Sequence, residues 1–126
     1  MNLNDRLENG KLLPLADKPN NVSTQTEDAD KKLDPLPYRG SKEESKKRLK
    51  SILESMEKVV IKNENDSMIY AIETSSFFKF KDDIDFLFSD EENVIHYRSA
   101  SRTGYSDFGV NKKRMKTIRE LYMEEI

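Results

Sequence analysis

The chain has 126 residues, which is the size of one domain. Charged residues make up 37% and hydrophobic residues 35%, and the formal net charge of -2 does not favour nucleic acid or an anionic membrane as a partner. The absence of cysteine excludes disulfides, thiolate chemistry and Cys-ligated zinc. The first ten residues lack the apolar run of a signal peptide, and no stretch approaches a membrane span. The composition therefore predicts a soluble cytoplasmic protein.

Residues 1–39 have the composition of an arm rather than of a packed element. Prolines at positions 14, 19, 35 and 37 interrupt this region, and residues 20–32 are almost wholly polar. We expect a disordered tail over residues 1–11. Over residues 12–39 we expect an extended arm packed on the domain, because scattered apolar residues such as Leu12 and Leu36 can anchor it there.

The folded domain is expected over residues 40–126, and it begins and ends with an amphipathic helix. Ser41 and Glu44 match a capping box, in which each side chain satisfies a free backbone amide of the first turn. Apolar residues then recur at helical spacing and predict a helix over residues 42–56. A second helix is predicted over residues 111–125, with an apolar stripe formed by Met115, Ile118, Leu121 and Tyr122.

Four strands are predicted between the two helices, over residues 58–62, 68–74, 77–88 and 94–101. The third is interrupted at Lys81-Asp82-Asp83, which indicates a bulge or a bend. Short turns between successive strands require antiparallel pairing. Both helices must bury their apolar stripes, and one face of the sheet can receive them. The sequence therefore predicts an α+β fold in which two helices pack on one face of a four-stranded antiparallel sheet, in the order helix, four strands, helix, with an extended N-terminal arm.

Polar side chains are densest between Tyr97 and Asn111, where the fourth strand leads into the second helix. From Gly104 onward this loop has the glycine spacing of a P-loop, but Val110 and Asn111 occupy the positions of its lysine and hydroxyl residue, so the match to a nucleoside triphosphatase fails. A loop with glycine before a helix still presents free amides to an anion. The alternative is that Asp107 or Asn111 caps the helix and the glycines only permit the turn.

Arg98 and Arg102 share one face of the fourth strand, since they are four residues apart. Two half-buried guanidinium groups need partners, and the acidic residues of the third strand are the nearest candidates. One interpretation is a structural salt-bridge network that links the third and fourth strands. The other is a polar pocket in which an arginine receives a carboxylate or a phosphate. Asp83 and Asp85 alone are a weak basis for a metal site, and His96, the only histidine, is more typical of a structural role.

Four blocks of the sequence resemble the bacterial and plastid family called domain of unknown function 1499. They are Pro19–Gln25, Pro35–Tyr38, Phe78–Asp83 and Arg98–Asn111, the last continuing to Arg114 and Arg119. The resemblance covers about Leu13 to Tyr122 and implies a fold and a set of residues, but no reaction. Leu15 and Asn21 stand where members of that family commonly have two cysteines, so any role of those thiols cannot operate in this chain.

The predicted ligand-binding site lies where the loop from Arg98 to Asn111 meets the arm. The charged anchors are Arg98 and Arg102, the neutral donors are Ser99, Ser101, Tyr105 and Ser106, Asn111 caps the second helix with Arg114 one turn in, and the arm adds Ser23, Gln25 and Tyr38.

We expect a binding module for a small anionic or polar ligand. The alternative is a structural or protein-interaction domain in which the polar loop ties the arm to the sheet. An enzyme ranks third, because the sequence has no recognisable pair of base and nucleophile. We predict no catalytic residue, cofactor or metal, and no nucleic-acid or membrane partner. A protein partner stays open.

Overall fold

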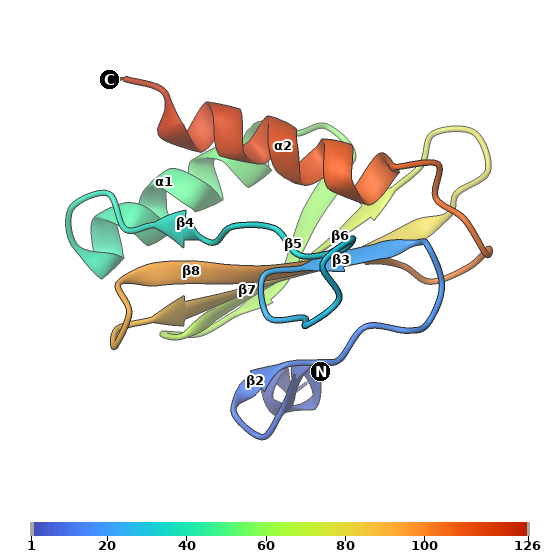
Figure 1. Ribbon diagram of the computed structural model, residues 1–126. Coiled ribbons are helices and arrows are strands. Elements are labelled where there is room, and N and C mark those ends of the chain that lie inside the picture. Colours follow the sequence, from blue (N-terminus) through green and yellow to red (C-terminus); the bar gives the residue numbers. More distant parts are fainter. Residues whose placement is uncertain (1, 126) are drawn as a thin grey trace.

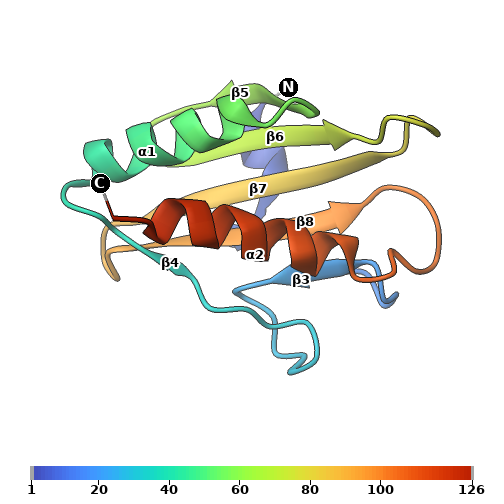
Figure 2. The same cartoon turned by 90° about the horizontal axis from the view of Figure 1, so that it is seen from above.

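The structure, a computed structural model, describes residues 2–125. Its centre is an antiparallel sheet of six strands in the order β3-β8-β7-β6-β5, with β4 also paired to β8. Two helices, α1 and α2, lie side by side on one face of this sheet (Figures 1 and 2). The bounds are β3 Asn21–Ser23, β4 Leu36–Pro37, α1 Lys42–Ser55, β5 Val59–Glu64, β6 Met68–Thr74, β7 Lys81–Ser89, β8 Val94–Ser101 and α2 Val110–Met123.

The two helices begin and pack as their sequence patterns predict. Ser41 accepts a hydrogen bond from the amide of Glu44, and the Glu44 side chain accepts one from the amide of Ser41, which confirms the capping box. Leu49 and Leu53 of α1 are fully buried, as are Ile118 and Tyr122 of α2. Together with the β7 and β8 side chains that point to the same face, they form the main hydrophobic core.

The expected four strands are present and antiparallel, but the sheet has six because the arm supplies two more. β3 pairs with residues 98–100 of β8, and β4 pairs with residues 94–95 on the same edge of that strand. The pattern of alternating residues could not predict them, since a strand of two or three residues is too short to show a period. The third strand also differs, because β7 begins at Lys81 and residues 77–80 form a loop before it.

Residues 3–12 are ordered on the opposite face of the sheet, where the sequence analysis expected disorder up to residue 11. They form a 3-10 helix, η1 (Leu3–Arg6), and a hairpin of β1 (Leu7–Glu8) and β2 (Lys11–Leu12). Asn9 and Gly10 both have positive φ, as a two-residue hairpin turn of the Asn-Gly type requires. Met1 lies outside the described residues.

An apolar patch on that face of the sheet explains why the N-terminal segment is ordered. Met68, Tyr70 and Ile72 of β6 alternate with the residues that face the helices, and they are buried by Leu3 and Leu12. The segment lies beneath the sheet in Figure 1, so the molecule has three layers, with the sheet in the middle. Within residues 2–125, no helix has the length and apolar character to cross a membrane.

Candidate functional site

Four of the predicted site residues meet in one buried network between β8 and the first turns of α2. The Ser99 hydroxyl donates to Oδ1 of Asn111 at 2.7 Å, and the Arg114 guanidinium donates to both groups. The Asn111 amide also donates to the Ser101 hydroxyl at 2.9 Å. Ser99 and Asn111 are fully buried. The structure therefore brings these four residues together, but in the interior rather than on a surface.

Two carboxylates on neighbouring strands neutralise Arg114. Its Nη2 lies 2.8 Å from Glu73 of β6 and 2.6 Å from Asp82 of β7. Burial lowers the pKa of Arg114, but the hydrogen bonds and charges of these two carboxylates raise it, and the net shift is upward. Because two anions already hold this cation, it lacks the free charge that would attract a third. Neither carboxylate belonged to the predicted site, since only the sheet register brings Glu73 and Asp82 opposite each other.

Asn111 does not cap α2, which is a correction to the sequence prediction. The helix begins after Gly109, whose φ of 81° is left-handed, and the Asp107 carboxylate accepts the amides of Gly109 and Asn111. Asp107 thus accepts hydrogen bonds from free amides at the start of the helix, which was one of the two alternatives in the sequence analysis. The Asn111 side chain is used instead to join Asn20 of the arm to β8.

Arg98 and Arg102 point to the other face of the sheet and do not contact this network. The Arg102 guanidinium binds Asp83 at 3.0 Å and donates to the Tyr70 hydroxyl. Burial raises the pKa of Asp83, but the hydrogen bonds from Arg102 and Tyr70 lower it, and the net pKa is below its ordinary value. This pair links β7 to the residue that follows β8, as the salt-bridge interpretation of the sequence expects.

Asp85 takes a cation that the sequence analysis placed in a disordered tail. Arg6 of η1 makes a bidentate contact with it, with Nε at 2.9 Å and Nη2 at 2.7 Å. Burial raises the pKa of Asp85 more than Arg6 lowers it. Arg98 lies opposite Asp85 in the sheet register, but its Nη2 donates to the carbonyl of Pro14 at 3.3 Å. Its Nε is buried and has no hydrogen-bond partner among residues 2–125.

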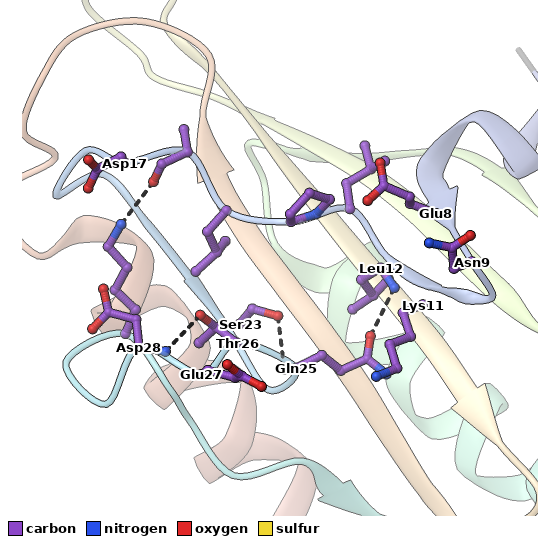
Figure 3. A pocket seen from close by; sticks show the side chains of 15 residues that line it. Glu8, Asn9, Lys11, Leu12, Asp17, Ser23, Gln25, Thr26, Glu27 and Asp28 are labelled. Atoms are coloured by element: carbon purple, nitrogen blue, oxygen red, sulfur yellow. Dashed lines mark hydrogen bonds between the residues drawn. The ribbon is translucent and has the colours of Figure 1, made fainter.

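The arm residues Ser23 and Gln25 line a cleft of about 530 Å³ between the β1–β2 hairpin and the arm (Figure 3). The side-chain Oε1 of Gln25 accepts the backbone amide of Leu12, and the Ser23 hydroxyl accepts the backbone amide of Gln25. Four acidic residues line the cleft against two lysines. That excess of negative charge makes it a poor receptor for an anion.

The remaining predicted residues lie apart from one another. Tyr38 is near the β7–β8 turn, where its hydroxyl donates to Asp90 and its ring packs near Phe88. Burial and the Asp90 carboxylate raise its pKa. Tyr105 and Ser106 are exposed in the loop before α2. The residues of the predicted site therefore lie on both faces of the sheet and at both of its ends.

A different cleft, which we call the α2 cleft, lies between one flank of α2 and the segment before β4. Its volume is about 410 Å³. Leu33, Tyr97 and Met115 supply apolar lining, and Tyr97 donates from its hydroxyl to the carbonyl of Asp34. Burial raises the pKa of Tyr97 to about 12, so this hydroxyl stays protonated. The other lining residues are Asp34, Gly109, Lys112, Lys113, Lys116 and Arg119.

The rim of the α2 cleft carries four cations and one carboxylate. Arg119 is fixed to the arm, because it donates to the carbonyls of Asp34 and Pro35. The three lysines are exposed, and none of them takes part in the ion pairs of residues 2–125. Sequence reasoning missed these residues, although Lys112, Lys116 and Arg119 follow helical spacing beside the apolar stripe and so share one flank.

Comparison with known proteins gives one match. The model of a family described as protein of unknown function (DUF1499) matches residues 11–121. Searches of curated proteins and of solved structures gave no significant match. The match spans both helices and the whole six-stranded sheet, and it ends just before the last residues of α2.

Proposed function

We propose that this chain, which belongs to the DUF1499 family, is a binding module for a small anionic ligand with an apolar part. The α2 cleft is the binding site in this proposal. The observation that carries it is the combination of an apolar floor with three exposed lysines that have no carboxylate partner among the described residues. Ligand pockets typically have this composition, with a mainly apolar lining and a few polar groups that fix orientation.

The charges of the cleft suit one end of such a ligand. Lys112 and Lys116 are one helical turn apart on α2, so their ammonium groups can approach the same carboxylate or phosphate. Arg119 lies almost one turn further along and anchors the opposite wall through the carbonyls of Asp34 and Pro35. The apolar part of the ligand would then cover Leu33 and Met115.

The predicted loop retains a part in this proposal. Gly109, near its end, lines the cleft, and the network of Ser99, Asn111 and Arg114 fixes the first turns of α2 against β8. These residues set the position of the helix that carries the lysines. Their role is therefore positional, and the ligand's charge is met by the lysines rather than by Arg98 or Arg102.

A structural domain without a ligand is the second candidate. The occupation of both terminal nitrogens of Arg114, by two carboxylates and two neutral acceptors, favours it. In that case the polar loop serves only to join the arm, the sheet and α2. The two candidates differ in whether any anion stabilises the fold through the lysines of α2.

Thermal unfolding with a matched series of small molecules tests the proposal. The series contains inorganic phosphate, alkyl phosphates, alkyl carboxylates and the neutral alcohols of equal chain length. A ligand at about a hundred times its dissociation constant adds about 2.7 kcal/mol to the free energy of unfolding. We expect the melting temperature to rise with the alkyl phosphates or carboxylates, and to change little with the alcohols.

The matched variants are Lys112→Gln with Lys116→Gln, and Lys47→Gln with Lys58→Gln as a control. Both pairs remove two exposed positive charges, but Lys47 and Lys58 lie away from the cleft. We expect the first pair to abolish the response to the anionic amphiphiles and the control to keep it. Equal responses in both pairs, or none in the unaltered protein, would favour the structural domain.

A further inference from the structure

Five large aromatic side chains are exposed at one end of the molecule. They lie on two loops, residues 75–80 between β6 and β7 and residues 102–109 between β8 and α2, and we call them the aromatic tip. Both loops extend beyond the same end of the sheet (Figures 1 and 2). The exposed fractions are 86% for Phe77, 68% for Phe78, 55% for Phe80, 71% for Tyr105 and 94% for Phe108.

The two loops approach each other at Phe80 and Phe108, whereas Tyr105 lines a neighbouring cleft beside the arm. The amide of Ser75 donates to the carbonyl of Phe80 and closes the first loop. The amide of Arg102 donates to the carbonyl of Lys81, so the two loops start from adjacent strands. Phe80 and Phe108 line one cleft of about 410 Å³ between them. Phe78 stacks on Phe80 with ring centroids 5.4 Å apart, and Phe77 meets Phe78 edge-on at 5.0 Å.

None of these rings contributes to the hydrophobic clusters of the fold. Contiguous exposed apolar surface of this kind marks a site of interaction. The backbone is consistent with a specific role, because Lys79 and Phe108 have positive φ values of 58° and 54°. The other two non-glycine residues with positive φ are asparagines, which tolerate that conformation. A bulky residue held there is more often functional than incidental.

The charges around the aromatic tip are positive. Lys79 and Lys81 alternate with the phenylalanines in the first loop, and Lys112 follows the second loop on α2. The carboxylates of the same end are already used, since Glu73 and Asp82 bind Arg114 and Asp107 accepts the first amides of α2. With Arg114, the three lysines outnumber these three carboxylates by one, so this end of the molecule is slightly cationic although the overall charge is -2.

We propose that the aromatic tip docks this domain on an anionic lipid surface, with the phenylalanine rings in the interface and the lysines against the headgroups. Aromatic rings favour the boundary between headgroups and acyl chains, and lysines near a membrane are drawn to its negative charge. Stable peripheral anchoring takes two signals, and residues 77–81 supply both, the apolar rings and the positive charges. Protein interfaces are depleted in lysine, whereas lysines alternate with phenylalanines here, which favours a lipid surface over a protein partner. The proposal departs from the sequence prediction of no membrane partner, which rested on net charge.

Vesicle sedimentation of the full chain tests the proposal. The vesicles contain phosphatidylcholine alone or with about one third phosphatidylserine, at low and at high salt. We expect binding to the anionic vesicles, with a loss of at least about tenfold on neutral vesicles and a clear weakening in high salt. No sedimentation with anionic vesicles at low salt would overturn the proposal.

Variants assign the binding to the aromatic tip. F77S/F78S/F108S should lose at least about tenfold in vesicle affinity, and K79Q/K81Q should lose affinity for anionic vesicles only. The control is V60S/M123S, which removes two exposed apolar side chains away from the tip. Unchanged binding in the first variant would overturn the proposal. Loss of self-association without any vesicle binding would make the tip an interface between copies of the chain instead.

A fluorescent reporter gives a second measurement that does not depend on loss of binding. The chain has no tryptophan, so F78W introduces a single one. We expect its emission to shift to the blue with anionic vesicles, and brominated lipids to quench it. Emission that stays that of an exposed tryptophan while the protein sediments with the vesicles would place the contact elsewhere and overturn the proposal. The α2 cleft variants leave these five rings in place and K79Q/K81Q leaves the α2 cleft intact, so only Lys112 is shared and failure of one proposal does not decide the other.

Discussion

At the scale of single residues, two arginines that look alike in the sequence have very different environments. The Arg114 side chain is 4% exposed and has four side-chain acceptors, one each on β6, β7, β8 and α2. The Arg102 side chain is 40% exposed and binds Asp83 and the Tyr70 hydroxyl. Breaking a buried ion pair strands a charge, whereas an exposed pair is screened by water.

The substitution Arg114→Met should therefore be strongly destabilising. It leaves Glu73 and Asp82 close together without their shared cation and removes a donor from Ser99 and Asn111. We expect a loss of about 3–5 kcal/mol in the free energy of unfolding, measured by urea denaturation. A loss below that of an exposed control, Lys47→Met, would show that the network contributes little.

Arg102→Met should cost about 1 kcal/mol or less at neutral pH, because the pair is more than one third exposed. Its effect should also depend on pH. The pKa of Asp83 is lower in the folded state than in the unfolded chain, so this carboxylate contributes stability above about pH 3.9 that is lost as the pH falls through its folded pKa. Urea unfolding at pH 7 and near pH 3 should show the difference between the variant and the original protein shrinking in acid. A difference that is equal at both values would contradict this assignment.

At the scale of elements, the N-terminal segment is tied to the sheet by a buried charge as well as by apolar contacts. Leu3 and Leu12 cover Met68 and Tyr70, and the Arg6 guanidinium lies 4.4 Å from the centre of the Tyr70 ring. Asp85, which is fully buried, depends on Arg6 for its direct ion pair. The segment is thus a part of the fold rather than an appendage.

Arg6→Met should cost about 3–5 kcal/mol at neutral pH, because it leaves the Asp85 carboxylate buried and unpaired. Without Arg6 the pKa of Asp85 should rise further above its unfolded value. A carboxyl group whose pKa is raised on folding favours the folded state below its unfolded pKa. That contribution is lost as the pH rises through its folded pKa. The defect should therefore be smaller near pH 3, and Asp85→Asn in the same chain should restore part of the lost stability. A double-mutant cycle by urea unfolding measures this, and purely additive effects would argue against coupling.

The elements that the sequence predicts well are those with long, periodic patterns. Leu49 and Leu53 belong to an apolar stripe along α1, and Ile84 and Phe86 belong to an alternating pattern along β7. Burial of one face of such an element can therefore be recognised in the sequence. β3 and β4 leave none, because two or three residues are too few to show a period, although Val22 and Leu36 are buried in the main core. The N-terminal hairpin did carry a signal in Asn9-Gly10, but its strands of two residues offered no period beside it.

The candidate site was harder to predict than the fold, because the sheet register decides which polar residues meet. Ser99 and Arg98 are neighbours in the sequence and point to opposite faces, so one joins α2 and the other approaches Pro14. The alternation of side chains along a strand could indicate that separation. It could not predict Glu73 as the partner of Arg114 or Arg6 as the partner of Asp85. Those contacts join residues more than 40 positions apart.

At the scale of the whole molecule, β8 connects almost every part. It pairs with β3, β4 and β7, and its side chains contact α2 on one face and approach Pro14 of the arm on the other. The arm thus joins the fold through contacts between residues 21–23 and 98–100. A structure organised around one strand cannot lose a layer without weakening the rest.

We therefore expect a single cooperative unfolding transition. Far-UV circular dichroism, which reports the helices and sheet, and tyrosine fluorescence, to which Tyr70 and Tyr97 contribute from opposite faces, should give coincident urea curves. An earlier transition in the fluorescence signal alone would indicate that the N-terminal layer unfolds separately.

The way in which β3 and β4 share one side of β8 has a consequence for behaviour at high concentration. An unbroken row of free amides at the margin of a sheet is a template on which other chains can add strands and form fibrils. Here that margin is split into two short pieces, and Pro37 in the second has no amide to donate. The opposite margin, β5, has a register shift between Ile61 and Asn63, with Lys62 between them. Concentrated solutions of this protein should resist cross-β assembly, and replacing Pro37 by valine should make thioflavin-positive fibrils appear sooner.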